Sequence, residues 1–397
     1  MSADHKNRDG RSDDLLRYRP EFPILDRTTY LISNSLGAMP RGVYDALQNY
    51  ADTWATQGVR AWDTWWMKAA EIGDQIGTLM NALPGNIAIH QNVTTCQAVI
   101  ASCFDFSGRR NKVVYSDLNF PSVMYFWEAQ RERGARVQMV PTDDGIHVPT
   151  ERLLEAIDEN TLLVPISHVI FRSAYINDAR AIIERAHRVG AHVVLDTFQS
   201  LGTVPVDIQA LNADFACGGV LKWLCGGPGV AYLYVRPDLG KKLEPKFTGW
   251  MAHQQPFAFE IGPIRYTDPP YRFVNGTPNI PALAAAAPGL KIIAEVGVEK
   301  IRQKSQRQTA RLIELADEHG WKVNTPRDPA QRGGTVSIDM PDSKEVCAEL
   351  LKRDILVDWR PKAGVRMSTH FYNTDTELEA AISAVEQILQ SRSALAR

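Results

Sequence analysis

One lysine of the sequence stands in unusual surroundings. Lys222 follows an apolar, strand-like segment, and glycines crowd around it at positions 218, 219, 226, 227 and 229. Lysine is rarely placed in apolar surroundings without a partner, and desolvation there lowers the pKa of its amine. A neutral amine can attack a carbonyl carbon and form a Schiff base, so the position favours covalent chemistry. The ordinary alternative is a surface lysine whose stem packs on apolar residues.

A carboxylate precedes this lysine at the end of another apolar segment. Asp196 directly follows the run HVVL, where a buried sheet presents side chains to a ligand. It could bind a metal, position a base or pair with a protonated ring nitrogen. Taken alone, Asp196 could equally be a helix cap or a turn residue. Paired with Lys222 one strand later, it favours a chemical site.

The glycines beside Lys222 do not form a dinucleotide-binding fingerprint. That fingerprint needs a strand, the pattern GxGxxG and then a helix. Here GGPG leads into the strand-like run VAYLYV, and Pro228 interrupts the pattern. The glycines are therefore interpreted as a tight turn that returns the chain to the sheet.

Alternating strands and helices are expected to position these residues. The predicted strands cover residues 112–116, 136–141, 162–166, 192–195, 215–218 and 230–235. Helices are predicted over residues 69–83 and 178–189, the second capped at Asn177-Asp178. Such alternation predicts an α/β fold with a mostly parallel, doubly wound sheet that binds its ligand at the carboxyl ends of the strands.

A different pattern begins near residue 290 and predicts a smaller α+β domain. It consists of a long helix over residues 290–319, the strand-like GGTVSIDM, a helix over 346–353, the run ILVDW and a last helix over 376–389. We therefore expect an N-terminal arm over residues 1–28, a large domain over 29–288 and a small domain over 289–397. A cleft between two domains is the expected place for the chemistry.

Composition restricts the possible partners and the compartment. The 397 residues carry a net charge of −2, which gives no electrostatic reason to expect nucleic acid or an acidic membrane surface. The first twenty residues mix both charge signs and resemble no secretory signal, and no apolar run has the length of a membrane span. The five cysteines are scattered without CxxC pairs, so no disulfide framework or metal site is expected. The expected compartment is the cytoplasm.

Seven segments, in order along the chain, resemble one enzyme family. The chain is similar to fold-type I enzymes that use pyridoxal 5′-phosphate (PLP), within the class V aminotransferase group, and there most resembles kynureninases over nearly its whole length. The segments are YLISNSLGAMPRG (30–42), GVRAWDTWW (58–66), SDLNFPSVMY (116–125), VPVD (204–207), CGGVLKWLCGGPG (217–229), GWMAHQQPFAFE (249–260) and NGTP (275–278).

The resemblance implies a role for each matching position. Lys222 would form the internal Schiff base with PLP, and later act as a general base. Asp196 would pair with the protonated ring nitrogen, which keeps the ring an electron sink. Phe120 would stack on the pyridine ring, with Ser122 also at the cofactor.

The resemblance also implies residues that bind the cofactor's phosphate. Val93 and Thr94 would offer backbone and hydroxyl donors, and Trp250 and Thr277 would complete the set. The family takes the residue at the position of Thr277 from the neighbouring subunit, which implies a homodimer. The ordinary alternatives are a core aromatic for Trp250 and a turn hydroxyl for Thr277.

An arginine is expected to bind the carboxylate of the substrate. The segment GVRMSTHFYNT (364–374) resembles the one whose arginine holds this group in the family. Arg366 fits because a guanidinium binds a carboxylate through two parallel hydrogen bonds. Arg360 is the rival candidate, and either could be a plain surface arginine.

Three positions depart from the kynureninase pattern. Gln199 stands where that family has a histidine, and resembles the wider class V group, in which it contacts the 3′-oxygen of the cofactor. Leu221 replaces a tyrosine that contacts phosphate and takes part in proton transfer. In the segment Phe120-Pro121-Ser122-Val123 an apolar residue replaces an acidic one. The cofactor-holding residues are retained, while groups tied to kynurenine cleavage are not.

The expected function is therefore a PLP-dependent enzyme that acts on an α-amino acid. The first hypothesis is a kynureninase-like lyase or hydrolase that breaks a C–C or C–S bond at the substrate β-carbon. The second is an aminotransferase that passes the amino group to a keto acid. A third is a non-catalytic PLP-fold protein, which the retention of Lys222 and Asp196 disfavours.

Overall fold

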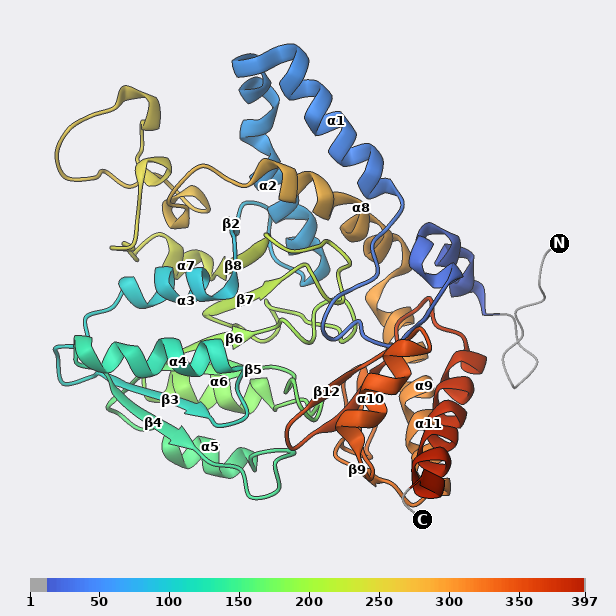
Figure 1. Ribbon diagram of the computed structural model, residues 1–397. Helices are drawn as coiled ribbons and strands as arrows, with labels where there is room; N and C mark the ends of the chain where they lie inside the picture. The colour runs from blue at the N-terminus through green and yellow to red at the C-terminus, as the bar shows by residue number, and fades with distance from the viewer. Residues whose placement is uncertain (1–12, 396–397) are drawn as a thin grey trace.

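A seven-stranded sheet forms the centre of the protein, for which a computed structural model describes residues 13–395 (Figure 1). The spatial order of the strands is β2 (Ile87–His90), β8 (Ala231–Val235), β7 (Phe215–Gly219), β6 (His192–Asp196), β5 (Thr161–Ser167), β3 (Lys112–Ser116) and β4 (Arg136–Val140). Strands β4, β3, β5, β6 and β7 run parallel, whereas β8 is antiparallel to both of its neighbours. The predicted α/β fold with a mostly parallel sheet is confirmed.

Helices cover both faces of this sheet. One face packs against α2 (Trp62–Leu79), α5 (Thr150–Ala156), α6 (Ala179–Arg188) and α8 (Ile280–Val296), and the other against α3 (Val93–Ser102) and α4 (Pro121–Ala129). Along β6, Val193 and Leu195 join the first core while Val194 joins the second. This period of two, with apolar residues on both faces, is the pattern of a strand buried between helix layers.

Local sequence signals explain where the elements begin. Helix α6 starts after Asp178, whose side chain accepts a hydrogen bond from the Ala181 N–H at 2.9 Å, as the predicted cap requires. Helix α4 starts at Pro121, a residue suited to a first helical position because it has no N–H to satisfy. The remaining helices of this region are α1 (Gly42–Gln57) and α7 (Pro237–Gly240).

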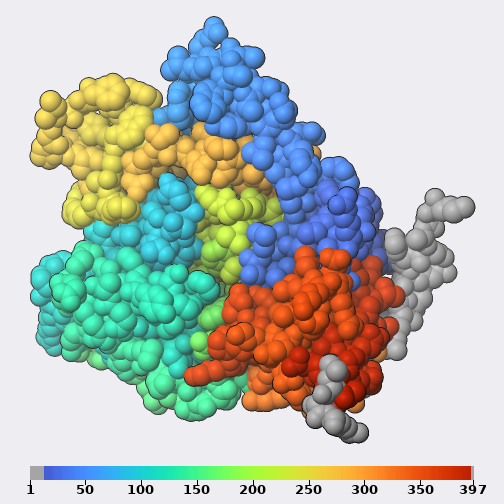
Figure 2. Space-filling view, in the orientation of Figure 1, coloured from blue at the N-terminus to red at the C-terminus, as the bar shows by residue number. Residues whose placement is uncertain are grey.

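A second, antiparallel sheet lies in the C-terminal part of the chain. Its order is β12 (Asp358–Arg360), β13 (Gly364–Ser368), β10 (Thr335–Asp339) and β9 (Lys322–Val323). It shares a separate hydrophobic core with α9 (Val298–Glu318), α10 (Ser343–Lys352) and α11 (Asp375–Leu395). The short strand β11 (Ile355–Leu356) pairs in parallel with β1 (Thr29–Tyr30). Figure 2 shows this part packed beside the N-terminal segment and the large sheet's half of the molecule.

The expected single helix over residues 290–319 is wrong. The chain forms two helices, α8 and α9, which meet at an angle of 80° around Gly297. Gly297 has a φ of 85°, a conformation that glycine adopts without the steric cost of a side chain. Among the described residues no single helix is long and apolar enough to cross a membrane, and only this bent pair, taken together, passes by length and composition.

The N-terminal segment packs against the C-terminal part of the protein. From residue 13 it forms two 3₁₀ turns, η1 (Asp14–Glu21) and η2 (Pro23–Asp26). Phe22 is fully buried, and Arg19 forms a salt bridge with Glu377 at 2.8 Å. Residues 1–12 of the predicted arm, with most of the segment that was compared with a secretory signal, lie outside the described residues.

Candidate active site

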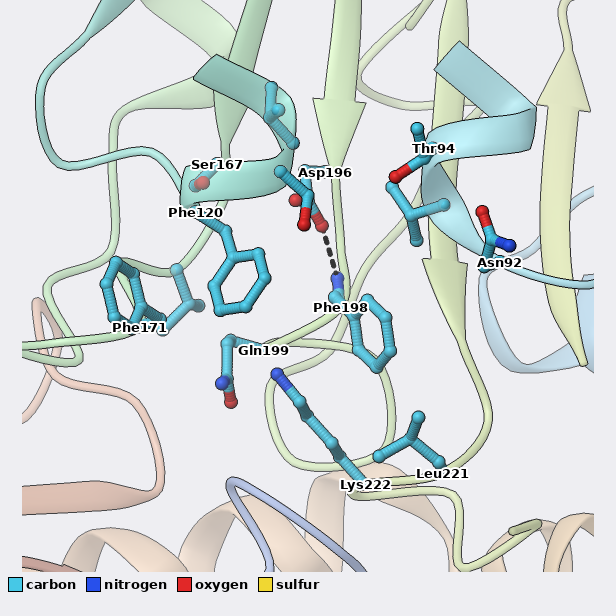
Figure 3. A pocket seen from close by; sticks show the side chains of 14 residues that line it. Asn92, Thr94, Phe120, Ser167, Phe171, Asp196, Phe198, Gln199, Leu221 and Lys222 are labelled. Carbon is cyan, nitrogen blue, oxygen red and sulfur yellow. Dashed lines mark hydrogen bonds between the residues drawn. The ribbon is translucent and has the colours of Figure 1, made fainter. Parts of the chain in front are cut away.

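A pocket opens at the carboxyl ends of β5, β6 and β7, where the fold predicts a ligand (Figure 3). Its volume is about 240 Å³. The lining residues come from these strand ends and from the starts of α3 and α4: Asn92, Val93, Thr94, Phe120, Ser122, Val123, Ser167, Val169, Phe171, Asp196, Phe198, Gln199, Leu221 and Lys222. Seven residues predicted from the sequence are thus brought together: Val93, Thr94, Phe120, Ser122, Asp196, Gln199 and Lys222.

Lys222 extends into this pocket from the loop after β7. Its Nζ lies 4.3 Å from the ring centroid of Phe198 and 5.5 Å from that of Phe120. The side chain keeps some exposed surface because it faces the pocket, yet protein atoms surround it. Burial lowers the pKa of the amine to about 8. The carboxylates of Asp196 and Asp358 oppose this shift, whereas the charges of Arg366 and Arg360 add to it. About a tenth of the amine is therefore neutral at pH 7, and this neutral form is the nucleophile.

Asp196 ends strand β6 and is nearly fully buried, with 6% of its surface exposed. Its Oδ1 accepts a hydrogen bond from the Phe198 N–H at 2.9 Å (Figure 3). Burial raises the pKa of the carboxyl group, while this N–H and the charge of Lys222 oppose the rise. A buried carboxylate with so few donors is suited to a ligand that brings a proton or a positive charge.

The glycines around Lys222 form a turn, as expected, and a second loop packs closely against this turn. Gly37, in the loop after β1, donates its N–H to the Leu221 carbonyl oxygen at 2.8 Å. A Cβ at Gly37 would lie only 2.1 Å from the Lys222 carbonyl oxygen, so this approach requires a glycine. After the lysine, Gly229 has a φ of 98° at the point where the chain enters β8. The loop that carries the lysine is therefore fixed on both sides.

The start of helix α3 forms the opposite end of the pocket. The side chain of Asn92 caps the helix by accepting a hydrogen bond from the Thr95 N–H at 2.9 Å. Val93 and Thr94 occupy the first turn and line the pocket together with Ser122 from α4. The first turn of a helix presents N–H groups and the positive end of the helix dipole, which suits an anion such as phosphate.

Gln199 is held in one orientation at the side of the pocket. Its Nε2 donates to the Asn34 carbonyl oxygen at 2.9 Å, and its Oε1 accepts from the Trp223 Nε1–H at 2.9 Å. Leu221 and Val123, the other two departures from the kynureninase pattern, also line the pocket. Both positions therefore carry an apolar side chain where kynureninases have a polar one.

Arg366 lies directly behind the pocket rather than on its lining. It is 2% exposed and forms a two-point salt bridge with Asp358, the residue opposite it in strand β12. Its Nη1 donates to the carbonyl oxygen of Phe171, which does line the pocket, at 2.6 Å. Arg360, the rival, contacts the same carboxylate at 3.0 Å but has 41% of its side chain exposed. Arg366 is therefore the more buried of the two and has more partners.

Trp250 and Thr277 lie outside this pocket. They line a separate hollow of about 700 Å³, together with residues from η3 (Gly58–Ala61) and α2. The hollow is strongly aromatic: the Trp66 ring centroid lies 5.8 Å from that of Trp250 and 5.0 Å from that of Phe257. Within one chain, the structure does not bring these two predicted phosphate ligands to Lys222.

Several lining residues escaped the sequence analysis. Ser167 ends β5, and the predicted strand stopped one residue short of it. Asn92 has a helix-capping residue type and stands before an apolar run, a signal that could have identified it. Phe171 and the Arg366 partner Asp358 had no local signal, because their roles depend on contacts between distant segments.

Comparisons with known proteins agree with this geometry. The model of the family described as Aminotransferase class-V matches residues 29–380. The chain is 31% identical to an uncharacterized aminotransferase, YcbU, of Bacillus subtilis (strain 168), covering 93% of this chain and 96% of that protein. It is 30% identical to a kynureninase of Pseudomonas fluorescens, covering 96% and 94% of the two chains.

A solved structure extends the comparison to the fold. The apo structure of a cysteine desulfurase from Thermococcus onnurineus NA1 superposes with a TM-score of 0.84, covering 94% of this chain and 98% of the other. The two sequences are 23% identical, so this likeness bears on the fold alone. The family match spans most of the chain and includes the whole pocket. The protein therefore belongs to the class V aminotransferase family of PLP-dependent enzymes.

Proposed function

We propose that this protein binds PLP at Lys222 and acts on an α-amino acid. The observation that carries the proposal is that Lys222, Asp196 and Phe120, from three separate segments, face one small pocket. PLP offers an aldehyde to an amine, a ring nitrogen to a carboxylate and a flat ring to an aromatic side chain. The three side chains meet these three requirements.

The far end of the pocket supports the same assignment. The first turn of α3, with Val93 and Thr94, fits the phosphate of PLP, and Ser122 adds a hydroxyl from α4. Gln199, fixed by Asn34 and Trp223, stands where class V enzymes contact the 3′-oxygen of the ring. The pocket thus offers donors at one end and a reactive amine at the other.

Bound PLP would supply an electron sink that weakens the bonds at the substrate α-carbon. The protein's own groups would do the rest. Asp196 would hold a proton on the ring nitrogen, and the Lys222 amine, once released, would move the α-proton. Arg366 would bind the substrate carboxylate. Its guanidinium already contacts Asp358 and the Phe171 carbonyl oxygen, and its Nη2 donates to the Asn34 amide oxygen at 3.0 Å, so the substrate would replace part of this set.

The reaction we favour is a kynureninase-like cleavage of a C–C or C–S bond at the β-carbon of the substrate. Its support is the 30% identity to a kynureninase over nearly the whole chain. Leu221 argues against kynurenine as the substrate, because a leucine cannot donate the proton that the family's tyrosine supplies. The side chain of the natural substrate is therefore expected to differ from kynurenine.

The second candidate is an aminotransferase. The similarity to the uncharacterized aminotransferase YcbU and the glutamine at position 199 favour it. In this reaction Lys222 would return the α-proton to the cofactor, which needs no further acid in the pocket. The apolar Leu221 is compatible with a reaction that needs no second proton donor.

A homodimer is part of the proposal. Trp250 and Thr277 line an aromatic hollow away from Lys222 in their own chain, as expected for residues that serve the site of a partner. The hollow's rim is unusually apolar for an exposed surface: Val59 is 82% exposed and Phe257 63%. Exposed apolar patches of this kind mark interaction surfaces.

The test combines spectroscopy with product analysis. Purified protein supplied with PLP should develop a visible absorption band, and Lys222→Ala should lose it while keeping the fold. Incubation with amino acids then separates the candidates. Release of alanine, pyruvate or a thiol without a keto acid indicates the lyase, whereas a lasting change of the band that a keto acid reverses indicates the aminotransferase. A wild-type protein without any band would contradict the proposal.

A further inference from the structure

Phe198 faces Phe120 across the pocket (Figure 3). The view shows the two rings on opposite sides of the space between the Asp196 carboxylate and the Lys222 amine. The Lys222 Nζ lies 4.3 Å from the centroid of the Phe198 ring and 5.5 Å from that of Phe120. Both distances are close to the spacing of stacked aromatic rings. The family resemblance gives Phe120 a role at the cofactor, whereas Phe198 still has none.

A flat ligand joined to both Asp196 and Lys222 passes between these two rings. In the pyridine ring of PLP, the nitrogen and the carbon that carries the aldehyde stand at opposite corners. With the nitrogen at the carboxylate and the aldehyde at the amine, the ring spans the space that Phe120 and Phe198 border. One face of the ligand is then turned toward Phe120 and the other toward Phe198.

The backbone of Phe198 is fixed beside the carboxylate. Its N–H donates to Oδ1 of Asp196 at 2.9 Å, in the turn that follows strand β6. The residue that offers a ring to the ligand is therefore tied to the residue that receives the ligand's nitrogen. This hydrogen bond sets where the Phe198 side chain leaves the main chain.

The Phe198 ring rests on Gly219, the last residue of strand β7. A Cβ at Gly219 would lie 2.6 Å from Cζ of the phenyl ring, 3.0 Å from Cε2 and 3.2 Å from Cε1. These three atoms form the outer edge of the ring, so the edge lies directly on the glycine backbone. A larger residue at position 219 would displace the ring, because close-packed atoms leave no room for a further methyl group.

The opposite ring is supported in a different way. Phe120 stands directly before helix α4, and its ring packs edge-on against that of Phe171, with the centroids 5.2 Å apart. Phe171 also lines the pocket, and its carbonyl oxygen accepts a hydrogen bond from Arg366. Both rings that border the space are therefore backed by protein atoms, as a rigid binding site for a flat ligand requires.

From this arrangement we propose that Phe198 is a further cofactor-binding residue, which forms with Phe120 a two-sided aromatic clamp on the pyridine ring of PLP. Gly219 sets the position of the Phe198 ring. The clamp matters most when the cofactor is not covalently linked to Lys222, because non-covalent contacts alone then retain it. This inference rests on the proposed function and adds a residue to its site.

The test uses pyridoxamine 5′-phosphate, the amine form of the cofactor, which cannot form the covalent bond to Lys222. Its binding to the full-length apoprotein, measured by equilibrium dialysis, reports the non-covalent contacts alone. Phe198→Ala should weaken this binding by about tenfold, because a stacked aromatic contact and its buried area are lost. The side chain is only half-buried, so the variant should fold. If it does not, Phe198→Leu replaces it, with an expected loss of at least about fivefold.

Gly219→Ala tests the support of the ring through a double-mutant cycle. Alone, it should weaken binding of pyridoxamine phosphate by at least about fivefold, because the added Cβ displaces the Phe198 ring. Added to Phe198→Ala, it should cost less than about twofold, because the ring is then absent.

Phe104→Ala is the matched control for the loss of a phenyl ring. Phe104 is also half-buried and packs against the same hydrophobic core as Phe198. Its ring contacts that of Phe215, with centroids 6.2 Å apart, at the start of strand β7 rather than at the end that carries Gly219. This variant should bind pyridoxamine phosphate as the wild type does.

The outcomes separate the inference from the function on which it rests. Unchanged or tighter binding in Phe198→Ala, with normal binding to the wild type, would overturn the clamp and leave the PLP-dependent function intact. No loss from Gly219→Ala alone, or an equal loss in both backgrounds, would overturn the role of Gly219. A wild-type protein that binds neither PLP nor pyridoxamine phosphate would contradict the proposed function itself, and the inference with it.

Discussion

Burial of the Lys222 amine predicts how cofactor uptake depends on pH. Because its pKa is lowered to about 8, the amine is mainly protonated below that pH and mainly neutral above it. Only the neutral amine attacks the aldehyde of PLP. The rate at which apoprotein takes up PLP should therefore rise as pH increases through about 8 and level off above it. A stopped-flow record of the visible band checks this, and a profile that still rises near the ordinary lysine pKa would contradict it.

Asp196 offers a second test at the scale of single residues. Asparagine in its place can still accept the Phe198 N–H bond but cannot stabilise a positive ring nitrogen. Asp196→Asn should lower kcat by about 10²-fold or more. Stability should not fall, because a neutral amide avoids the cost of burying a charge, the same cost that raises the pKa of Asp196. A variant that turns over normally would remove Asp196 from the mechanism.

At the scale of elements, the loop after β1 fastens the lysine loop. Gly37→Ala would place a Cβ 2.1 Å from the Lys222 carbonyl oxygen, so one of the two loops must move. The expected cost is about 1–3 kcal/mol of unfolding free energy, with weaker cofactor binding. Gly108→Ala is the control, since an added Cβ there meets nothing within 4 Å. Urea unfolding of both variants checks the prediction, and equal stability would contradict it.

A cluster at the other end of strand β6 allows a pH prediction for stability alone. Buried Asp214 accepts hydrogen bonds from His187, His192 and the Val193 N–H. Burial opposes ionisation, but these partners outweigh it and lower the pKa of the carboxyl group overall. The stability that this group contributes is present above its ordinary pKa and is lost as pH falls through the lowered one. In Asp214→Asn, urea unfolding should show a smaller acid-dependent loss, with normal cofactor binding at neutral pH; an unchanged acid profile would contradict the prediction.

The elements differ in how well the sequence predicts them. Strand β3 occupies the predicted residues 112–116. Its β-branched, apolar residues favour a strand, and its buried position in the sheet favours the same residues. The bend at Gly297 was missed, because a single glycine within a helical pattern does not by itself say whether the helix ends. The pair of Asp358 and Arg366 was missed for another reason: it depends on the register of β12 against β13.

At the scale of the whole molecule, the location of Trp250 and Thr277 predicts active sites shared between two subunits. A Lys222→Ala chain and a Trp250→Ala/Thr277→Ala chain should each be inactive at low PLP concentration. Mixing them should restore activity to about one quarter of the wild-type value, because half of the dimers then hold one intact site. No recovery on mixing, with dimers seen by sedimentation, would contradict shared sites.

The site itself could be predicted to the extent that it follows the sheet. Asp196 ends a strand, Lys222 and Phe120 each follow one within a few residues, and parallel strands bring their carboxyl ends together. The contact of Arg366 with the Phe171 carbonyl oxygen could not be predicted, because the two residues lie 195 positions apart and meet only where the C-terminal sheet packs against the large one.

The central claim is that Lys222 carries the cofactor, and one measurement tests it most directly. Protein loaded with PLP is reduced with borohydride, digested and analysed by peptide mass spectrometry, with Lys222→Ala treated in parallel. The account predicts one phosphopyridoxyl group per chain, on Lys222, and none in the variant. A label on another lysine, or no label in protein that has been saturated with PLP, would contradict it.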